Sequence, residues 1–190
     1  MPTTTDLYEE LGRRAGYDYA RLRYIVRAGQ RAGLLPTSGR GKAALEVSVD
    51  DVVQFILCLA AIELVGDSKA PELVREFAVI ETSGDEGSTQ TLAETLRHLL
   101  KEAPGPYSMI RSPVGGARYH MPTIRFSVAD GPQAIMDFIP TDPDIRALEV
   151  RLRFGDGATG VVAPTYNERV VGSVMLFDLA RLLQPAKVSA

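Results

Sequence analysis

Residues 13–42 read RRAGYDYARLRYIVRAGQRAGLLPTSGRGK. This segment holds eight basic residues and one acidic residue, Asp18, so its formal charge is +7. The net charge of the whole chain is −3, which leaves −10 for the other residues. Charge segregated in this way predicts either a surface that binds a polyanion or a surface that is neutralised by acidic residues elsewhere in the fold.

The spacing of apolar residues predicts two helices around this segment. The first covers residues 6–15, where Asp6 and Glu9 have the spacing of a capping box. The second covers residues 18–32, with Asp18 as its N-cap. Gly16 follows the first stretch, where a C′ glycine is expected, and Leu34-Leu35-Pro36 ends the second.

The second helix is predicted to carry a cationic stripe. Arg23, Arg27 and Arg31 are spaced at i, i+4 and i+8, so they share one face, opposite the apolar stripe. Arginines on an exposed helix face are more often solvated or paired with nearby acids than bound to a partner. Residues 19–45, however, contain no acidic residue, which favours a free surface.

The residues that follow predict a wing. Residues 37–47 have glycines on both sides of Arg40, then Lys42 and an apolar tail, which predicts a flexible tip leading into a short strand. The apolar run 49–65, capped by Ser48, predicts the next helix. Helix, turn, helix, tip, strand, helix is the order of a winged helix-turn-helix, whose second helix enters the major groove of DNA.

The second half of the chain changes from helical spacing to alternating apolar and polar residues. Before this change, Pro71 marks the start of one further helix, and Thr91 with Glu94 marks another. Ser173 is expected to cap a closing helix. Strands are expected at 124–128, 134–139, 147–154 and 169–172.

We therefore expect an α+β fold. An N-terminal winged helix-turn-helix with further helices would be joined to a small C-terminal antiparallel sheet with a closing helix. The expected units are a winged DNA-binding domain at 1–66, a helical connector at 67–103 and an α+β dimerisation or ligand domain at 104–190.

The pattern L-x-x-R-A-G-Y-x-Y-x-x-L-R-Y, followed by A-G-L-L-P, resembles the DNA-binding domain of MerR-type regulators. In that family a helix ending in an A-G turn leads to a helix bearing L-R-Y, then to G-L-L, a wing and another helix. The long dimerising helix and the effector-site cysteines of the family have no counterpart here. The glycine-basic tip with a small α+β tail also resembles DNA-binding proteins of phages and prophages. The matching residues are Leu11, Arg14, Ala15, Gly16, Leu22, Arg23, Tyr24, Ala32, Gly33, Leu34, Leu35 and Pro36.

Ten residues make up the predicted DNA-binding surface. Phosphate contacts would supply most of the affinity, and base contacts near the start of the second helix would supply specificity. Whether each tyrosine faces DNA or packs on the first helix is left open by the pattern. The ten are Arg14, Tyr17, Tyr19, Arg21, Arg23, Tyr24, Arg27, Arg31, Arg40 and Lys42.

The sequence contains no G-x-S-x-G, P-loop or H-E-x-x-H motif, so we expect no catalysis, no cofactor and no metal. His98 is expected at the surface, His120 beside a loop, and the single cysteine, Cys58, in the core. The chain starts without a basic region before an apolar run, and its most apolar stretch is too short to cross a bilayer. A cytoplasmic protein without membrane contact is expected.

These observations favour a sequence-specific transcriptional regulator of bacterial or phage origin that binds double-stranded DNA. A homodimer is expected because one short helix rarely makes enough base contacts. One alternative is a DNA-recognition protein similar to the small subunit of phage terminase, which a ring of many subunits would indicate. Another is a protein-interaction or inhibitor module whose basic face binds an acidic partner. Salt-dependent binding to random DNA would count against this alternative.

Overall fold

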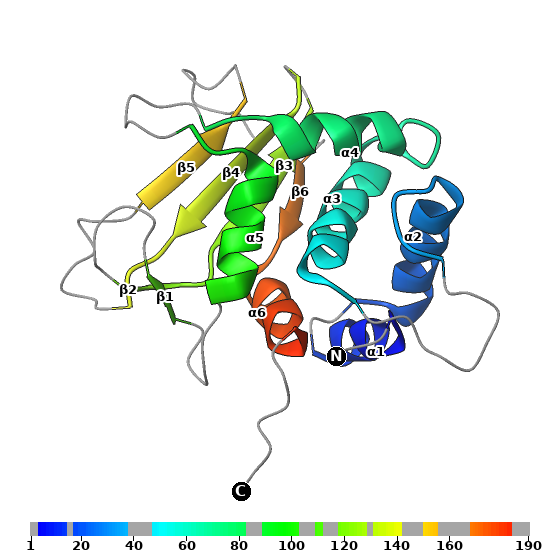
Figure 1. Cartoon of the computed structure of the whole chain (residues 1–190), viewed down its shortest axis with the longest axis horizontal. Helices are drawn as coiled ribbons and strands as arrows, with labels where there is room; N and C mark the ends of the chain where they lie inside the picture. The colour runs from blue at the N-terminus through cyan, green and yellow to red at the C-terminus, as the bar shows by residue number, and fades with distance from the viewer. Residues whose placement is uncertain are drawn as a thin grey trace, which may run out of the picture.

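The computed structural model describes residues 4–14, 17–37, 47–82, 89–102, 109–111, 118–128, 131–141, 150–155 and 168–183. These residues form six helices, a four-stranded antiparallel sheet and a two-stranded sheet (Figure 1), so the expected α+β class is confirmed. In chain order the elements are α1 (Thr4–Arg14), α2 (Tyr19–Arg31), α3 (Val49–Val65), α4 (Ala70–Val79), α5 (Leu92–Glu102), β1 (Met109–Arg111), β2 (Arg118–His120), β3 (Thr123–Ser127), β4 (Gln133–Phe138), β5 (Val150–Phe154), β6 (Glu168–Val171) and α6 (Ser173–Leu182).

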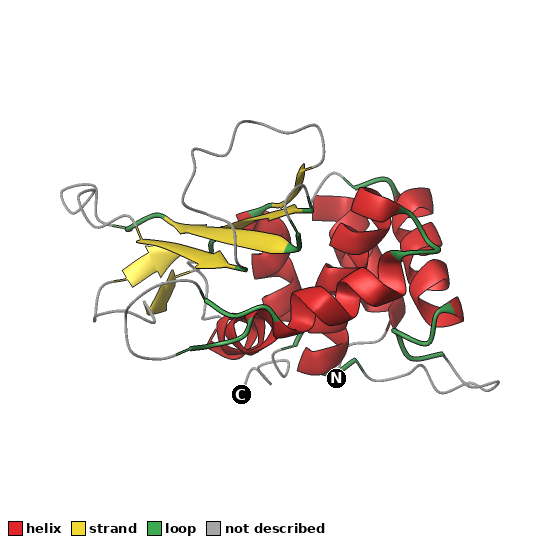
Figure 2. Ribbon diagram, turned by 90° about the horizontal axis from the view of Figure 1, so that it is seen from above, coloured by secondary structure: helices red, strands yellow, loops and turns green. Residues whose placement is uncertain are grey.

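The larger sheet has the strand order β5-β4-β3-β6, and each neighbouring pair is antiparallel. The sheet occupies one end of the molecule and the helices α1 to α3 occupy the other (Figure 2). Alternation along β3 buries Phe126 completely on the face that meets α4. The strands predicted at 124–128, 134–139 and 169–172 are confirmed as β3, β4 and β6, with bounds shifted by one residue. The strand predicted at 147–154 corresponds to β5, and the start of that range lies outside the described residues.

Helix α3 is the centre of the fold, because it packs against α2, α4, α5 and β6. It is apolar around most of its circumference, as expected of a helix enclosed by other elements. Its predicted start is confirmed: the backbone N–H of Asp51 donates to Ser48 Oγ at 3.1 Å, and the N–H of Ser48 donates to Asp51 Oδ2 at 2.8 Å. Cys58 is completely buried here, and burial raises the pKa of its thiol to about 12.

The last helix, α6, packs against α1 and α5, so it completes the core of the N-terminal helices. Buried side chains from Leu7 to Ala180 form one hydrophobic cluster. The three units at 1–66, 67–103 and 104–190 stay a prediction.

Two predicted helix caps are wrong in detail. Helix α1 begins at Thr4, so Asp6 lies inside the first turn and does not precede the helix. Helix α6 begins at Ser173, and the capping position is Gly172, which has no side chain to accept a hydrogen bond. The predicted cap of the helix from Leu92 is confirmed, since the N–H of Glu94 donates to Thr91 Oγ1 at 3.2 Å.

Most of the predicted wing lies outside the described residues. Residues 38–46, which include Arg40, Lys42 and the tip, are not described, and the flanking residues 36–37 and 47–48 belong to no strand. A winged helix-turn-helix therefore stays a prediction, whereas the helices on either side of the tip are confirmed as α2 and α3.

Gly29 lies inside α2, where glycine costs about 1 kcal/mol relative to alanine. A Cβ atom at this position would lie 2.9 Å from Cγ of the buried Leu35, so glycine permits the close approach of the chain that follows α2. We expect Gly29→Ala to lower the free energy of unfolding by about 1 kcal/mol. Overpacking against Leu35 destabilises the variant by about 1–3 kcal/mol, and the higher helix propensity of alanine stabilises it by about 1 kcal/mol. Urea denaturation followed by circular dichroism would measure this, and a stabilised variant would mean that Leu35 moves aside freely.

Candidate nucleic-acid interface

Helix α2 begins as the sequence predicts and turns its apolar side inward. The side chain of Asp18 accepts from the backbone N–H groups of Ala20 at 3.3 Å and Arg21 at 3.2 Å. The buried stripe faces α1 and α3, and the opposite face lies at the end of the molecule farthest from β5 (Figure 1). The buried residues are Leu22, Ile25, Val26, Ala28 and Gly29.

Arg23 and Arg27 lie on the exposed face of α2, one turn apart. Neither forms an ion pair in the part of the chain that the structure describes. Both lie near Tyr8, where their charges lower the phenol pKa, but burial and the neighbouring Tyr19 outweigh them and the pKa of Tyr8 is raised to about 12. Tyr19 packs edge-on against Tyr8 with ring centres 6.2 Å apart and keeps 48% of its surface exposed. An aromatic ring and two cations that form no ion pair with any described residue therefore share one surface.

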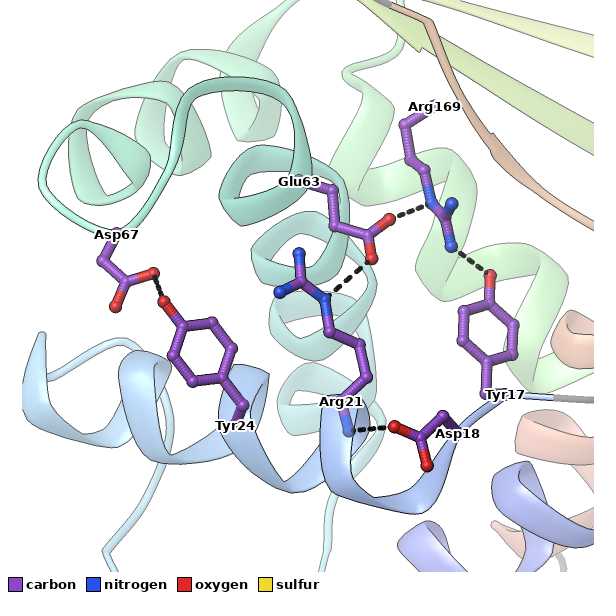
Figure 3. A network of polar contacts seen from close by, with 7 residues as sticks. All are labelled: Tyr17, Asp18, Arg21, Tyr24, Glu63, Asp67 and Arg169. Atoms are coloured by element: carbon purple, nitrogen blue, oxygen red, sulfur yellow. Dashed lines mark hydrogen bonds and ion pairs between the residues drawn. The ribbon is translucent and has the colours of Figure 1, made fainter.

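The other two arginines of α2 have acidic partners. Arg21 Nε lies 3.4 Å from Glu63 Oε1, near the end of α3. Arg31 Nη2 lies 3.5 Å from Asp67 Oδ2, in the turn between α3 and α4. The expected free surface is therefore wrong for Arg21 and Arg31. Residues 19–45 contain no acid, but the end of α3 and the turn after it bring the carboxylates of Glu63 and Asp67 to α2 in space (Figure 3).

Tyr24 and Tyr17 are also held by contacts within the molecule. The Tyr24 hydroxyl donates to Asp67 Oδ1 at 2.5 Å, and the guanidinium of Arg21 lies 5.3 Å from the centre of the Tyr24 ring. The hydroxyl of half-buried Tyr17 accepts from Arg169 Nη2 at 2.9 Å. Tyr17 therefore contacts β6, whereas 41% of the Tyr24 surface stays exposed.

Glu63 joins these contacts into one network. Its side chain is only 14% exposed and lies between Arg21 and Arg169, with an ion pair to each (Figure 3). The network runs from Tyr17 through Arg169 and Glu63 to Arg21, so it ties the start of α2 to α3 and to the edge strand β6. Sequence reasoning missed Glu63 and Arg169 as site residues; the only signal was an acidic residue inside an apolar run.

The structure gathers six of the ten predicted site residues on α2 and places a seventh in the turn before it. The side chain of Arg14 and all of Arg40 and Lys42 lie outside the described residues. The six on α2 are Tyr19, Arg21, Arg23, Tyr24, Arg27 and Arg31, and the seventh is Tyr17.

The structure also locates the histidines. His98 is exposed on α5 and His120 is exposed at the end of β2, where its backbone N–H donates to the carbonyl oxygen of Ile139. No group of three or more potential metal ligands occurs within the described ranges. In those same ranges every helix is too short or too polar to cross a bilayer.

Comparisons of the chain with protein-family models, with curated proteins and with solved structures gave no significant match. The function is therefore inferred from the chain's own residues and their geometry.

Proposed function

We propose that this protein binds double-stranded DNA through the exposed face of α2 and acts as a transcriptional regulator. The observation that carries the proposal is the pair Arg23 and Arg27, exposed on one face and without a carboxylate partner among the described residues. Exposed arginines without a carboxylate partner attract phosphates, and binding is favoured because each neutralised phosphate releases counterions into solution.

The neighbouring side chains fit the same function. Tyr19 stands beside this pair with an exposed ring, and Arg31 continues the stripe with a side chain that is 69% exposed. Tyrosine hydroxyls and arginines contact phosphates, and arginines also contact base edges. Since one short helix reads few base pairs, a symmetric homodimer on paired half-sites would complete the recognition.

The test is a double variant, Arg23→Ala/Arg27→Ala. Each lost phosphate contact removes about 0.9 from the slope of log K against log salt, so losing two contacts weakens binding at 0.1 M salt by about 60-fold. Gel shifts with random and with genome-selected duplexes, at several salt concentrations, would measure the loss and the smaller slope.

The control is Arg75→Ala/Arg181→Ala, which removes the same charge from exposed positions on α4 and α6. We expect it to bind nearly as the wild type does, and both variants to keep the wild-type circular dichroism spectrum. Equal binding by the wild type and the α2 variant would overturn the proposal. Binding of an acidic protein but not of DNA would favour an interaction module instead.

A further inference from the structure

Asp67 faces the exposed end of the cationic stripe. It follows Gly66, the C-cap of α3, and its carboxylate accepts from the Tyr24 hydroxyl at 2.5 Å. Its other oxygen lies 3.5 Å from Arg31 Nη2. Asp67 thus engages a hydroxyl and a guanidinium of α2 at the same time (Figure 3 shows the contact with Tyr24).

The donors that Asp67 engages are those that bind a phosphate group. A tyrosine hydroxyl and an arginine fork are common partners of phosphate oxygens in protein–DNA complexes. Arg31 is one helical turn beyond Arg27, so it continues the row of cations that Arg23 and Arg27 begin. A polyanion lying along this row would reach Arg31 and meet the Asp67 carboxylate.

The contact between Asp67 and Arg31 is suited to exchange. The Arg31 side chain is 69% exposed and that of Asp67 is 37% exposed, so water screens the pair and little is lost when it opens. Glu63 differs, because its side chain is 14% exposed between two arginines and holds them within the fold. Glu63 therefore anchors α2 to the fold, whereas Asp67 makes an exposed contact with α2 that can open.

We propose that Asp67 is an internal competitor for phosphate, which occupies Tyr24 and Arg31 in the free protein and gives them up to a phosphate or sulfate group of a bound polyanion. This role of Asp67 has a biological meaning only if the exposed face of α2 binds DNA, as proposed above. It predicts that wild-type binding is weaker than it would be without Asp67, because the contacts of Asp67 with Tyr24 and Arg31 must open before a polyanion can replace them.

The experiment compares Asp67→Asn with Asp50→Asn. Both remove one negative charge, but Asp50 lies at the other end of α3 and pairs with Arg97. Retention on immobilised heparin and gel shifts with duplex DNA would be measured for both, with thermal melting to confirm folding. We expect Asp67→Asn to bind about fivefold more tightly at 0.1 M salt, because the exposed ion pair no longer has to open before Arg31 contacts the polyanion. Asp50→Asn should change binding less than about twofold.

Adding Arg31→Ala to Asp67→Asn should cancel the gain. Equal heparin retention by Asp67→Asn and Asp50→Asn would overturn the inference. The heparin result decides it even when no duplex binds, whereas absence of DNA binding by the wild type would contradict the proposed function alone.

Tyr24 gives a readout that needs no polyanion. The hydrogen bond to Asp67 raises the pKa of the Tyr24 phenol, since the carboxylate favours the protonated hydroxyl. In Asp67→Asn the phenol pKa should fall toward its ordinary value. An NMR titration of the tyrosine rings, with the Tyr24 signal assigned from Tyr24→Phe, would detect it; an unchanged pKa would mean that the contact is absent in solution.

Discussion

Replacing Phe126 by alanine is expected to lower the free energy of unfolding by about 4 kcal/mol. Phe126 lies on the interior strand β3, between β4 and β6, and is completely buried. Its ring meets Phe77 of α4 edge-on, with ring centres 5.2 Å apart and planes inclined by 71°. Removing the ring leaves a cavity between sheet and helix and also loses an aromatic pair worth about 1 kcal/mol.

Urea denaturation of Phe126→Ala, followed by far-ultraviolet circular dichroism, would measure this loss. The matched control is Ile139→Ala, because Ile139 follows β4 and is 57% exposed, so its truncation should change stability by less than about 0.5 kcal/mol. Comparable losses in the two variants would contradict the placement of β3 at the centre of the core.

The elements that the sequence predicted well are those specified by neighbouring residues. The bounds of α3 follow from the capping pair Ser48 and Asp51 and from an uninterrupted apolar run, both of which are local. The interior strands β3 and β4 follow from alternation, because each has buried side chains at alternate positions. The start of α1 was placed two residues late, since Asp6 serves as an acidic first-turn residue and not as a cap.

The candidate site was predicted only in part, for a physical reason. The exposed face of α2 is a property of one helix, so its period places Arg23 and Arg27 on the surface. The contacts of Tyr17 with Arg169 depend on packing, since the two residues are 152 positions apart in the chain. No periodicity carries such information.

Replacing Glu63 by alanine is expected to lower the free energy of unfolding by about 3 kcal/mol. The carboxylate is shared by Arg21 and Arg169, and its loss leaves two guanidinium groups together without a compensating charge. Removing one partner of a buried ion pair costs about 3–5 kcal/mol. The lower end applies because the Arg21 side chain is 47% exposed and can recover water.

A double-mutant cycle with Arg169→Ala separates the network from the general cost of truncation. If Glu63 and Arg169 act together, the double variant should be more stable than the sum of the single losses predicts, by about 1–2 kcal/mol. Glu76→Ala, an exposed glutamate on α4, is the control and should change stability by less than about 0.5 kcal/mol. A loss for Glu63→Ala no larger than for Glu76→Ala would mean that the network adds nothing to the fold. A large coupling would mean that β6 holds α2 in place through Glu63, so that Arg23 and Arg27 are presented by a helix anchored on its opposite side.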